Sequence, residues 1–167
     1  MNRLVADGVV KGYAIGGAIG ASFYMRAMQT EDLDIFVSLK DAPSGLVSLA
    51  PIYDALRAQG GRIEAGHVRF GEWAVQILTD ANALVTEAIR KAKSVTFDGV
   101  PTRVCTAEHL CAIALQVGRS KDLLRVALFL EQQAVDRKAL KELLARYHLT
   151  QQLARVEALG RGGSERE

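Results

Sequence analysis

The chain has 167 residues and a formal net charge of +2; 49% of its residues are hydrophobic and 24% are charged. This composition is ordinary for a globular protein with a core, and so small a net charge does not by itself indicate nucleic-acid binding. No apolar run approaches the roughly 20 residues that a transmembrane helix needs, and the N-terminus lacks the apolar stretch of a signal peptide. Two cysteines do not make a disulfide framework. We therefore expect a cytoplasmic protein with no membrane segment.

The first quarter of the chain predicts two short strands separated by a helix. Apolar residues favour a strand over 12–15, which the diglycine Gly16-Gly17 ends. From 18 to 28 apolar residues recur at helical spacing, so a helix should open directly after the glycines. Residues 33–37 (LDIFV) are rich in branched and aromatic side chains and predict a second strand.

The next segment predicts a helix followed by a pair of strands. The helix is expected over 46–59, with Pro51 in its first turn. Two strands are expected over 62–70 and 73–78, joined by a tight turn at Gly71-Glu72.

Another helix and another hairpin complete the α/β pattern. The helix should run to about residue 91 from an N-cap at Thr79 or Asp80. Strands over 94–97 and 100–104 flank Asp98-Gly99, the dipeptide that best suits a type I′ turn.

After residue 106 the pattern becomes helical. Residues 107–117 are almost all apolar and predict a buried helix, and 121–134 predict an amphipathic one. Asp136 and Thr150 are expected N-caps of two further helices. The last residues (GRGGSERE) have no apolar side chain to bury and predict disorder.

These elements predict an α/β fold, with a mixed sheet of about five strands flanked by helices and an all-helical C-terminal region. The expected domain organisation is an α/β domain over 1–104, a helical region packed on it over 105–159, and a disordered tail over 160–167.

The most informative residues are two aspartates on the second strand. Asp32 and Asp34 are two apart, so their side chains should share one face of the sheet, opposite Leu33. Two adjacent carboxylates suit a hard divalent cation, and Mg²⁺ usually takes one or two protein carboxylates plus substrate phosphates. Gly16-Gly17 would let backbone N–H groups approach an anion. The combination predicts a metal and triphosphate site.

The diglycine, the helix and T-x-D-L-D-I together resemble the polymerase β-like nucleotidyltransferase superfamily. The later stretch CTAEHLCAIALQVGRSKD is similar to small bacterial members, including AbiEii-type toxins and minimal nucleotidyltransferases. The resemblance implies that Asp32 and Asp34 are catalytic residues that bind Mg²⁺ or Mn²⁺. It implies nucleotide binding by the residues Gly16, Gly17, Thr30, Arg119 and Lys121.

The sequence departs from the family pattern at two positions. A third acid is expected on the strand over 73–78, but the matching residue is Gln76. An amide is a poor base and a weak Mg²⁺ ligand. Glu64 or Glu72 would be the substitutes. A lysine that reaches the triphosphate in many small relatives is matched by Ala114.

Three functions are compatible with the sequence. The first is metal-dependent transfer of a nucleoside monophosphate from a triphosphate to an unknown acceptor: a small molecule, a protein or an RNA end. The second is a catalytically degenerate relative that binds nucleotide or a partner protein, which Gln76 and Ala114 favour. The third is a toxin–antitoxin component, which requires a partner protein. Whether the chain is an enzyme depends mainly on Gln76.

Overall fold

The computed structural model describes residues 1–26, 30, 32–39 and 48–164. The helices are α1 (Asn2–Ala6), α2 (Gly17–Ala21), α3 (Ala50–Ala58), α4 (Ala83–Lys91), α5 (Ala107–Val117), α6 (Ser120–Glu131), α7 (Arg137–Arg146) and α8 (Thr150–Ser164). The strands are β1 (Val10–Ile15), β2 (Asp32–Leu39), β3 (Arg62–Glu64), β4 (His67–Phe70), β5 (Trp73–Thr79), β6 (Lys93–Phe97) and β7 (Val100–Val104). Among the described residues, no helix is long and apolar enough to cross a bilayer.

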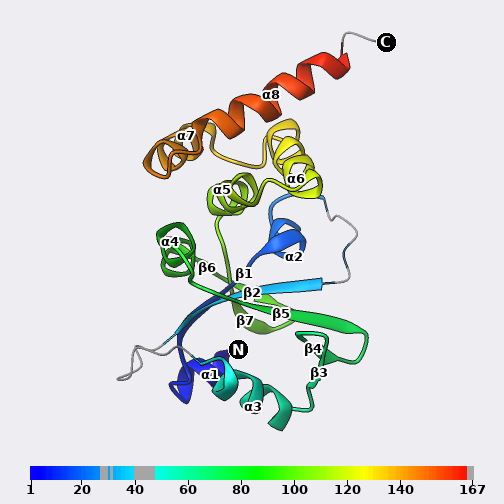
Figure 1. Cartoon of the computed structure of the whole chain (residues 1–167), viewed down its shortest axis with the longest axis vertical. Coiled ribbons are helices and arrows are strands. Elements are labelled where there is room, and N and C mark those ends of the chain that lie inside the picture. Colours follow the sequence, from blue (N-terminus) through cyan, green and yellow to red (C-terminus); the bar gives the residue numbers. More distant parts are fainter. Residues whose placement is uncertain (27–29, 31, 40–47, 165–167) are drawn as a thin grey trace.

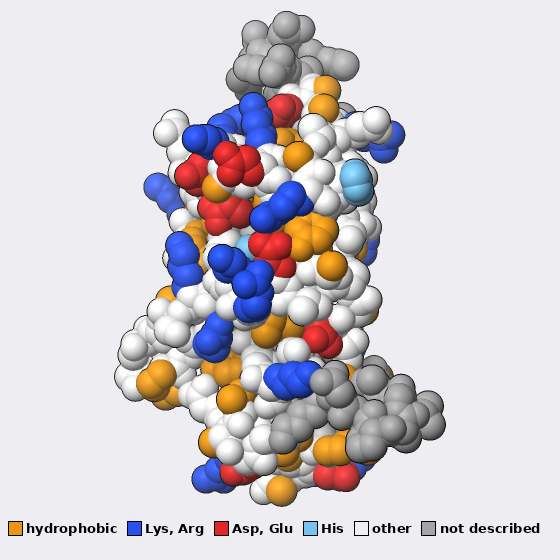
Figure 2. All heavy atoms as spheres, turned by 90° about the vertical axis from the view of Figure 1, so that its left-hand side faces the viewer, with side chains coloured by type: hydrophobic (Ala, Val, Ile, Leu, Met, Phe, Trp, Pro, Cys, Tyr) orange, Lys and Arg blue, Asp and Glu red, His pale blue; other side chains and the backbone are white. Residues whose placement is uncertain are grey.

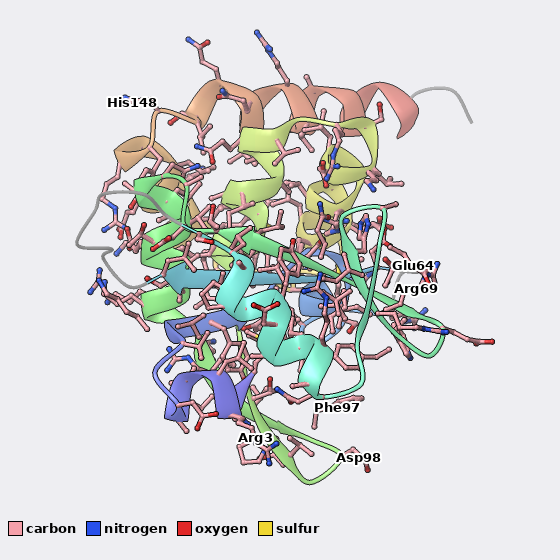
Figure 3. The ribbon with its side chains drawn as sticks, turned by 60° about the horizontal axis from the view of Figure 1, so that its bottom comes forward. Arg3, Glu64, Arg69, Phe97, Asp98 and His148 are labelled. Atoms are coloured by element: carbon pink, nitrogen blue, oxygen red, sulfur yellow. The ribbon has the colours of Figure 1, made fainter. Side chains whose placement is uncertain are left out.

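The strands form one mixed sheet in the order β3-β4-β5-β2-β1-β7-β6. At its centre β2 is parallel to β5 and antiparallel to β1. The sheet has seven strands, so the expected count of about five is too low. One reason is that the segment 62–70 is two strands, which turn at Ala65 and Gly66 with φ of 47° and 83°. An ion pair of 3.2 Å between Arg69 Nε and Glu64 Oε2 spans this hairpin (Figure 3).

Helices cover the two faces of the sheet unequally (Figure 1). On one face, here called the upper face, Ala14 and Phe36 pack into a large core with α4 and α5 and with the helices α6, α7 and α8 beyond them. On the lower face, Ile35 and Val37 pack with α1 and α3 into a smaller core. Alternate residues of β2 therefore enter different cores, as a strand covered on both faces requires.

Four of the predicted helices have different bounds. α3 begins at Ala50 and not at residue 46, where 46–47 lie outside the described residues, and α6 ends at Glu131 and not at residue 134. α2 is only Gly17–Ala21, whereas the helix was predicted to extend to residue 28. Residues 27 and 28 of that predicted helix lie outside the described residues. α4 is capped by neither Thr79 nor Asp80. Asn82 is its N-cap and accepts a 3.1 Å hydrogen bond from Val85 N. The Asp80 carboxylate instead accepts a 2.8 Å hydrogen bond from Ser38 Oγ, which makes it unavailable as a cap.

The helical half agrees with the sequence pattern except at its end. Thr106 caps α5, which ends at Gly118 with φ of 73°. Asp136 caps α7 through hydrogen bonds of 2.8 and 3.1 Å from Lys138 N and Ala139 N. α8 continues to Ser164, so the backbone of 160–164 is helical where a disordered tail was expected. Residues 165–167 lie outside the described residues.

Candidate functional site

Asp32 and Asp34 project from β2 toward the upper face, as the period of two predicts. Asp34 is half-buried and precedes Phe36, which belongs to the upper core, whereas Asp32 is exposed at the start of the strand. Thr30 lies just before it, and its hydroxyl lies 3.3 Å from Asp32 O and 3.4 Å from Asp32 N. Thr30 therefore supports the strand start that carries Asp32.

The diglycine is required by the close approach of β2. Gly16 N donates a 2.9 Å hydrogen bond to Asp34 O. A Cβ added at Gly16 would overlap the Phe36 ring, and one added at Gly17 would overlap Asp34 Oδ2. Gly17 also has φ of +57°, a conformation that L side chains rarely adopt. The sequence interpretation assigned the glycines to phosphate approach; the structure shows that they also let the Asp34 carboxylate lie against the backbone of Gly17.

Gln76 lies beside Asp34. The two residues are register partners in the parallel pairing of β2 with β5, and both line the same cavity. The third-acid position expected from the family resemblance is therefore occupied by an amide next to a carboxylate. The two substitutes considered from the sequence, Glu64 and Glu72, are on or next to the β3–β4 hairpin and do not line this cavity.

Across the cavity, α6 presents two arginines held by one buried carboxylate. Asp122 is 2% exposed. It accepts a 2.6 Å hydrogen bond from Arg119 Nε and a 3.3 Å bond from Arg125 Nη1. Arg125 Nε is buried and has no hydrogen-bond partner within the described part of the chain. Arg125 lines the cavity, so its positive charge favours an anionic ligand there.

The charge state of Asp34 reflects this setting. Its pKa is raised above the ordinary value, first because burial disfavours the charged form. Asp32 raises it further, whereas Arg125, Lys121 and Arg119 oppose the rise. A divalent cation would stabilise the ionised form, because an opposite charge nearby favours ionisation.

The cavity between the sheet and α5–α6 has a volume of about 360 Å³ and brings together three of the seven predicted site residues: Gly17, Asp34 and Arg119. Gly17, Asp34, Gln76, Arg119 and Arg125 line it. Ala114 also lines it and supplies no charge, as the sequence indicated. Four predicted site residues are not among its lining residues: Asp32, Gly16, Thr30 and Lys121. The positive charge of Lys121 lowers the pKa of Asp34.

Arg125 is the functional residue that sequence reasoning missed. A signal was present, because Arg119, Asp122 and Arg125 recur at three-residue spacing and so lie along one side of α6. What the spacing could not show is that this side of α6 faces β2.

A larger cavity, of about 770 Å³, lies elsewhere, between α4, α5 and α7. Two of its charged groups are paired: Glu87 accepts a hydrogen bond of 2.9 Å from Arg146, and it accepts another of 2.5 Å from the Tyr147 hydroxyl. Basic and acidic side chains are interspersed on this side of the molecule (Figure 2). The Glu87 cluster joins α4 to the end of α7, and none of the predicted site residues lines this larger cavity, so we place the candidate site at the smaller cavity.

The donor atoms around Asp34 fit one nucleotide-bound metal ion better than two. Two carboxylates on one face are the ligands that Mg²⁺ commonly uses together with substrate phosphates. Within the described ranges, no cluster of three or more acidic, histidine or cysteine side chains could hold a metal ion. A third carboxylate is missing because the residue next to Asp34 on β5 is Gln76.

Comparison with known proteins identifies the architecture. The sequence itself matches no family model and no curated protein. Among solved structures, the chain superimposes on the antibiotic-resistance factor ANT(2'')-Ia in solution with a TM-score of 0.53 and 13% identity, over 98% of this chain and 93% of that one. The chain has a nucleotidyltransferase-like fold.

Two further structures share this nucleotidyltransferase-like fold. A crystal structure of ANT(2'')-Ia in complex with adenylyl-2''-tobramycin gives a TM-score of 0.56 at 12% identity, over 88% of this chain and 92% of that chain. An antigenic nucleotidyltransferase-like protein from Paracoccidioides brasiliensis gives 0.55 at 13% identity, over 93% and 87%. The resemblance to AbiEii-type toxins is not addressed by these structures and stays a prediction.

Proposed function

We propose that the chain is a metal-dependent nucleotidyltransferase that transfers a nucleoside monophosphate from a triphosphate to an acceptor hydroxyl. The observation that carries this proposal is the pairing, across one cavity, of the Asp34 carboxylate with the partly unsatisfied guanidinium of Arg125. Carboxylates on one wall and arginines on the other are what a metal–triphosphate complex requires, since it presents a cation to one side and anionic oxygens to the other.

Each group has a specific part in this proposal. Asp32 and Asp34 would hold Mg²⁺ or Mn²⁺, which when bound withdraws charge from the phosphate oxygens. Arg119 and Arg125 would bind the triphosphate, with Asp122 fixing the orientation of both guanidinium groups. Arg125 thereby supplies the positive charge of the lysine that many small relatives have at the position of Ala114.

The reaction balances without any further reagent. A bond forms between the acceptor oxygen and the α-phosphorus, the bond from the α-phosphorus to the bridging oxygen of the leaving group breaks, and pyrophosphate departs. The acceptor hydroxyl loses a proton, which passes to bulk water. Gln76 cannot accept it, because a carboxamide is not a base at neutral pH. General-base catalysis contributes about 10²–10⁴-fold, so we expect transfer that is slow for this fold.

A second candidate is a nucleotide-binding protein that has lost the chemistry. The specific observation in its favour is Gln76, which lies at the register position beside Asp34 and lines the cavity. A toxin–antitoxin role would use the first chemistry and add a partner protein. Its own test is co-purification with the product of an adjacent gene.

Calorimetric titration with each of the four ribonucleoside triphosphates, with Mg²⁺, with Mn²⁺ and with chelator, tests the proposal. Binding is expected only with a divalent cation, and Asp34→Asn should abolish it. Asp7→Asn, at an exposed aspartate at the end of α1, is the control and should bind as the wild type does. Binding without a divalent cation would refute the metal dependence. Full affinity in Asp34→Asn would place the metal elsewhere. Pyrophosphate release then separates the enzyme from the binding protein.

A further inference from the structure

An apolar pocket of about 470 Å³ lies at the end of the sheet, next to the candidate site. One wall is formed by Ile19 of α2 and by Phe23, which follows α2. The opposite wall is the β6–β7 hairpin, where Phe97 and Val100 lie on either side of the turn; Figure 3 shows Phe97 at the free end of this hairpin. Trp73, at the start of β5, completes the rim.

The aromatic and aliphatic groups of this pocket are unusually accessible to water. Trp73 is 53% exposed, Phe97 65% and Val100 58%. Phe97 packs edge-on to Phe23 with ring centroids 6.0 Å apart, which holds the hairpin across the pocket. Contiguous exposed apolar surface of this kind marks a binding site more often than a free surface.

The lining specifies the chemistry of the ligand. None of the described residues that line the pocket is charged, and its polar groups are the hydroxyls of Ser22 and Thr102. The Ser22 hydroxyl donates a 2.7 Å hydrogen bond to Ile19 O, and Thr102 Oγ1 lies 3.2 Å from the Tyr13 hydroxyl. Both oxygens retain acceptor capacity. A concave, mainly apolar lining with a few hydroxyls, in the usual volume range of ligand pockets, fits an uncharged small molecule.

The position of the pocket relates it to the two carboxylates. Leu33, between Asp32 and Asp34 on β2, lines it from the lower face. Trp73 immediately precedes Ala74, which is the register partner of Asp32. Adjacent strands are about 4.8 Å apart and successive residues about 3.3 Å, so the backbone of Trp73 lies within roughly two residue spacings of the backbone of Asp32. The two side chains project to opposite faces, so a ligand in the pocket approaches Asp32 around the end of the sheet.

We propose that this pocket binds an uncharged, largely apolar small molecule, with its polar end toward Asp32, and that this molecule is the acceptor. Binding stands independently, whereas the acceptor role rests on the proposed nucleotide transfer. The nucleotide occupies the upper cavity and the apolar ligand occupies the end of the sheet, so the two bind together and do not compete.

The test uses N-phenyl-1-naphthylamine, an uncharged aromatic probe that becomes fluorescent in apolar surroundings. Trp73 is the only tryptophan of the chain, so energy transfer from it reports binding at this pocket. We expect saturable binding of one probe per chain with quenching of Trp73 emission. Val100→Asp should weaken binding about tenfold or more, because an unpaired charge in an apolar pocket is strongly unfavourable. Leu124→Asp on α6, at a residue 55% exposed and outside the pocket, is the matched control.

Circular dichroism verifies that each variant folds, and Phe97→Asp serves as a second variant should Val100→Asp unfold. Absent binding, or equal affinity in the pocket variants and the control, would overturn the inference. So would wild-type self-association that Val100→Asp abolishes, since the face would then join copies of the chain. In a second titration, Mg²⁺-nucleotide affinity is expected to be unchanged by the probe, and competition would overturn the acceptor role. Failure of nucleotide to bind while the probe still binds would refute the proposed function and leave the pocket.

Discussion

Asp34 on β2 and Gln76 on β5 are register partners, so a carboxylate and an amide lie side by side on the face that closes the cavity. Two carboxylates at these positions would repel each other unless a cation lay between them. Because the Gln76 amide is uncharged, it does not repel the Asp34 carboxylate, and no additional metal ion is needed between these two residues. Under the proposed function, this relationship limits the rate of nucleotide transfer.

Gln76→Glu should therefore raise divalent-cation affinity and accelerate pyrophosphate release, by about 10²–10⁴-fold if the new carboxylate acts as the base. The change preserves the length of the side chain. Pyrophosphate release with Mg²⁺ and mixed triphosphates is the measurement. Gln116→Glu adds the same charge to the rim of the same cavity from α5 and should not accelerate release. Fast release by the wild type would show that another group performs the role of the base.

Gly17→Ala should displace the Asp34 carboxylate and abolish Mg²⁺-nucleotide binding. The new Cβ overlaps Asp34 Oδ2, and the positive φ adds strain of about 1–2 kcal/mol. Gly71→Ala is the matched control, because Gly71 has φ of +61° and nothing within 4 Å of an added Cβ. It should show the strain in urea denaturation but keep the affinity. If the two variants bound nucleotide equally well, the contact between Gly17 and Asp34 would be irrelevant to the site.

Asp122→Asn should lower the free energy of unfolding by about 3–5 kcal/mol, because it leaves the largely buried Arg125 without its carboxylate. Asp54→Asn provides the comparison. Asp54 also pairs with an arginine three residues along its helix, at 2.7 Å, but both side chains are exposed. Its loss should cost about 0–1 kcal/mol. Urea denaturation measures both, and similar costs would mean that the Asp122 cluster does not stabilise the fold.

Acidification should destabilise the protein below about pH 6.5 through His109. This side chain is 5% exposed, and burial lowers its pKa below the ordinary value of an imidazole despite the nearby Glu87. As the pH falls, the unfolded chain binds a proton before the folded one does, so the folded state loses stability. Burial alone would raise the pKa of Glu87, but the Tyr147 hydroxyl and Arg146 lower it, which adds a further loss at lower pH.

Thermal unfolding between pH 7.5 and 5.5 measures the slope due to His109. His109→Gln should flatten it, whatever its effect on absolute stability. His148→Asn is the control, since His148 is exposed and its φ of 57° is tolerated by asparagine. A slope that survives in His109→Gln would assign the acid sensitivity to other groups.

The parts of the fold that depend on local signals were predictable. The shared face of Asp32 and Asp34 follows from the period of two along a strand. The Asp98-Gly99 turn is confirmed, with φ of 48° and 76°, because the dipeptide itself favours that backbone conformation. The N-cap of α7 at Asp136 is equally local.

The remaining parts depend on tertiary contacts that no short pattern contains. The sequence does not show that Gly17 lies against Asp34, because that contact depends on how the turn after β1 packs on β2. It does not place Arg125 beside Asp34, since α6 reaches the sheet only through the packing of α5. The predictions of Thr79 and Asp80 as caps were wrong because both residues make contacts with β2. Thr79 pairs with Val37, and the Asp80 carboxylate accepts a hydrogen bond from Ser38 Oγ.

The attachment of the β6–β7 hairpin has a consequence for dynamics. β7 pairs with β1 at one position only, Ile15 with Val104, whereas β2 and β5 pair from Asp32–Ala74 to Val37–Thr79. Amide protons near Phe97 should therefore exchange with solvent through local opening, long before those of β2, which require global unfolding. Opening of the hairpin tip would break the contact of Phe97 with Phe23 and widen the apolar pocket, while the 2.7 Å hydrogen bond from Asn2 Nδ2 to Pro101 O keeps β7 in place and the pairing of β2 with β5 is undisturbed.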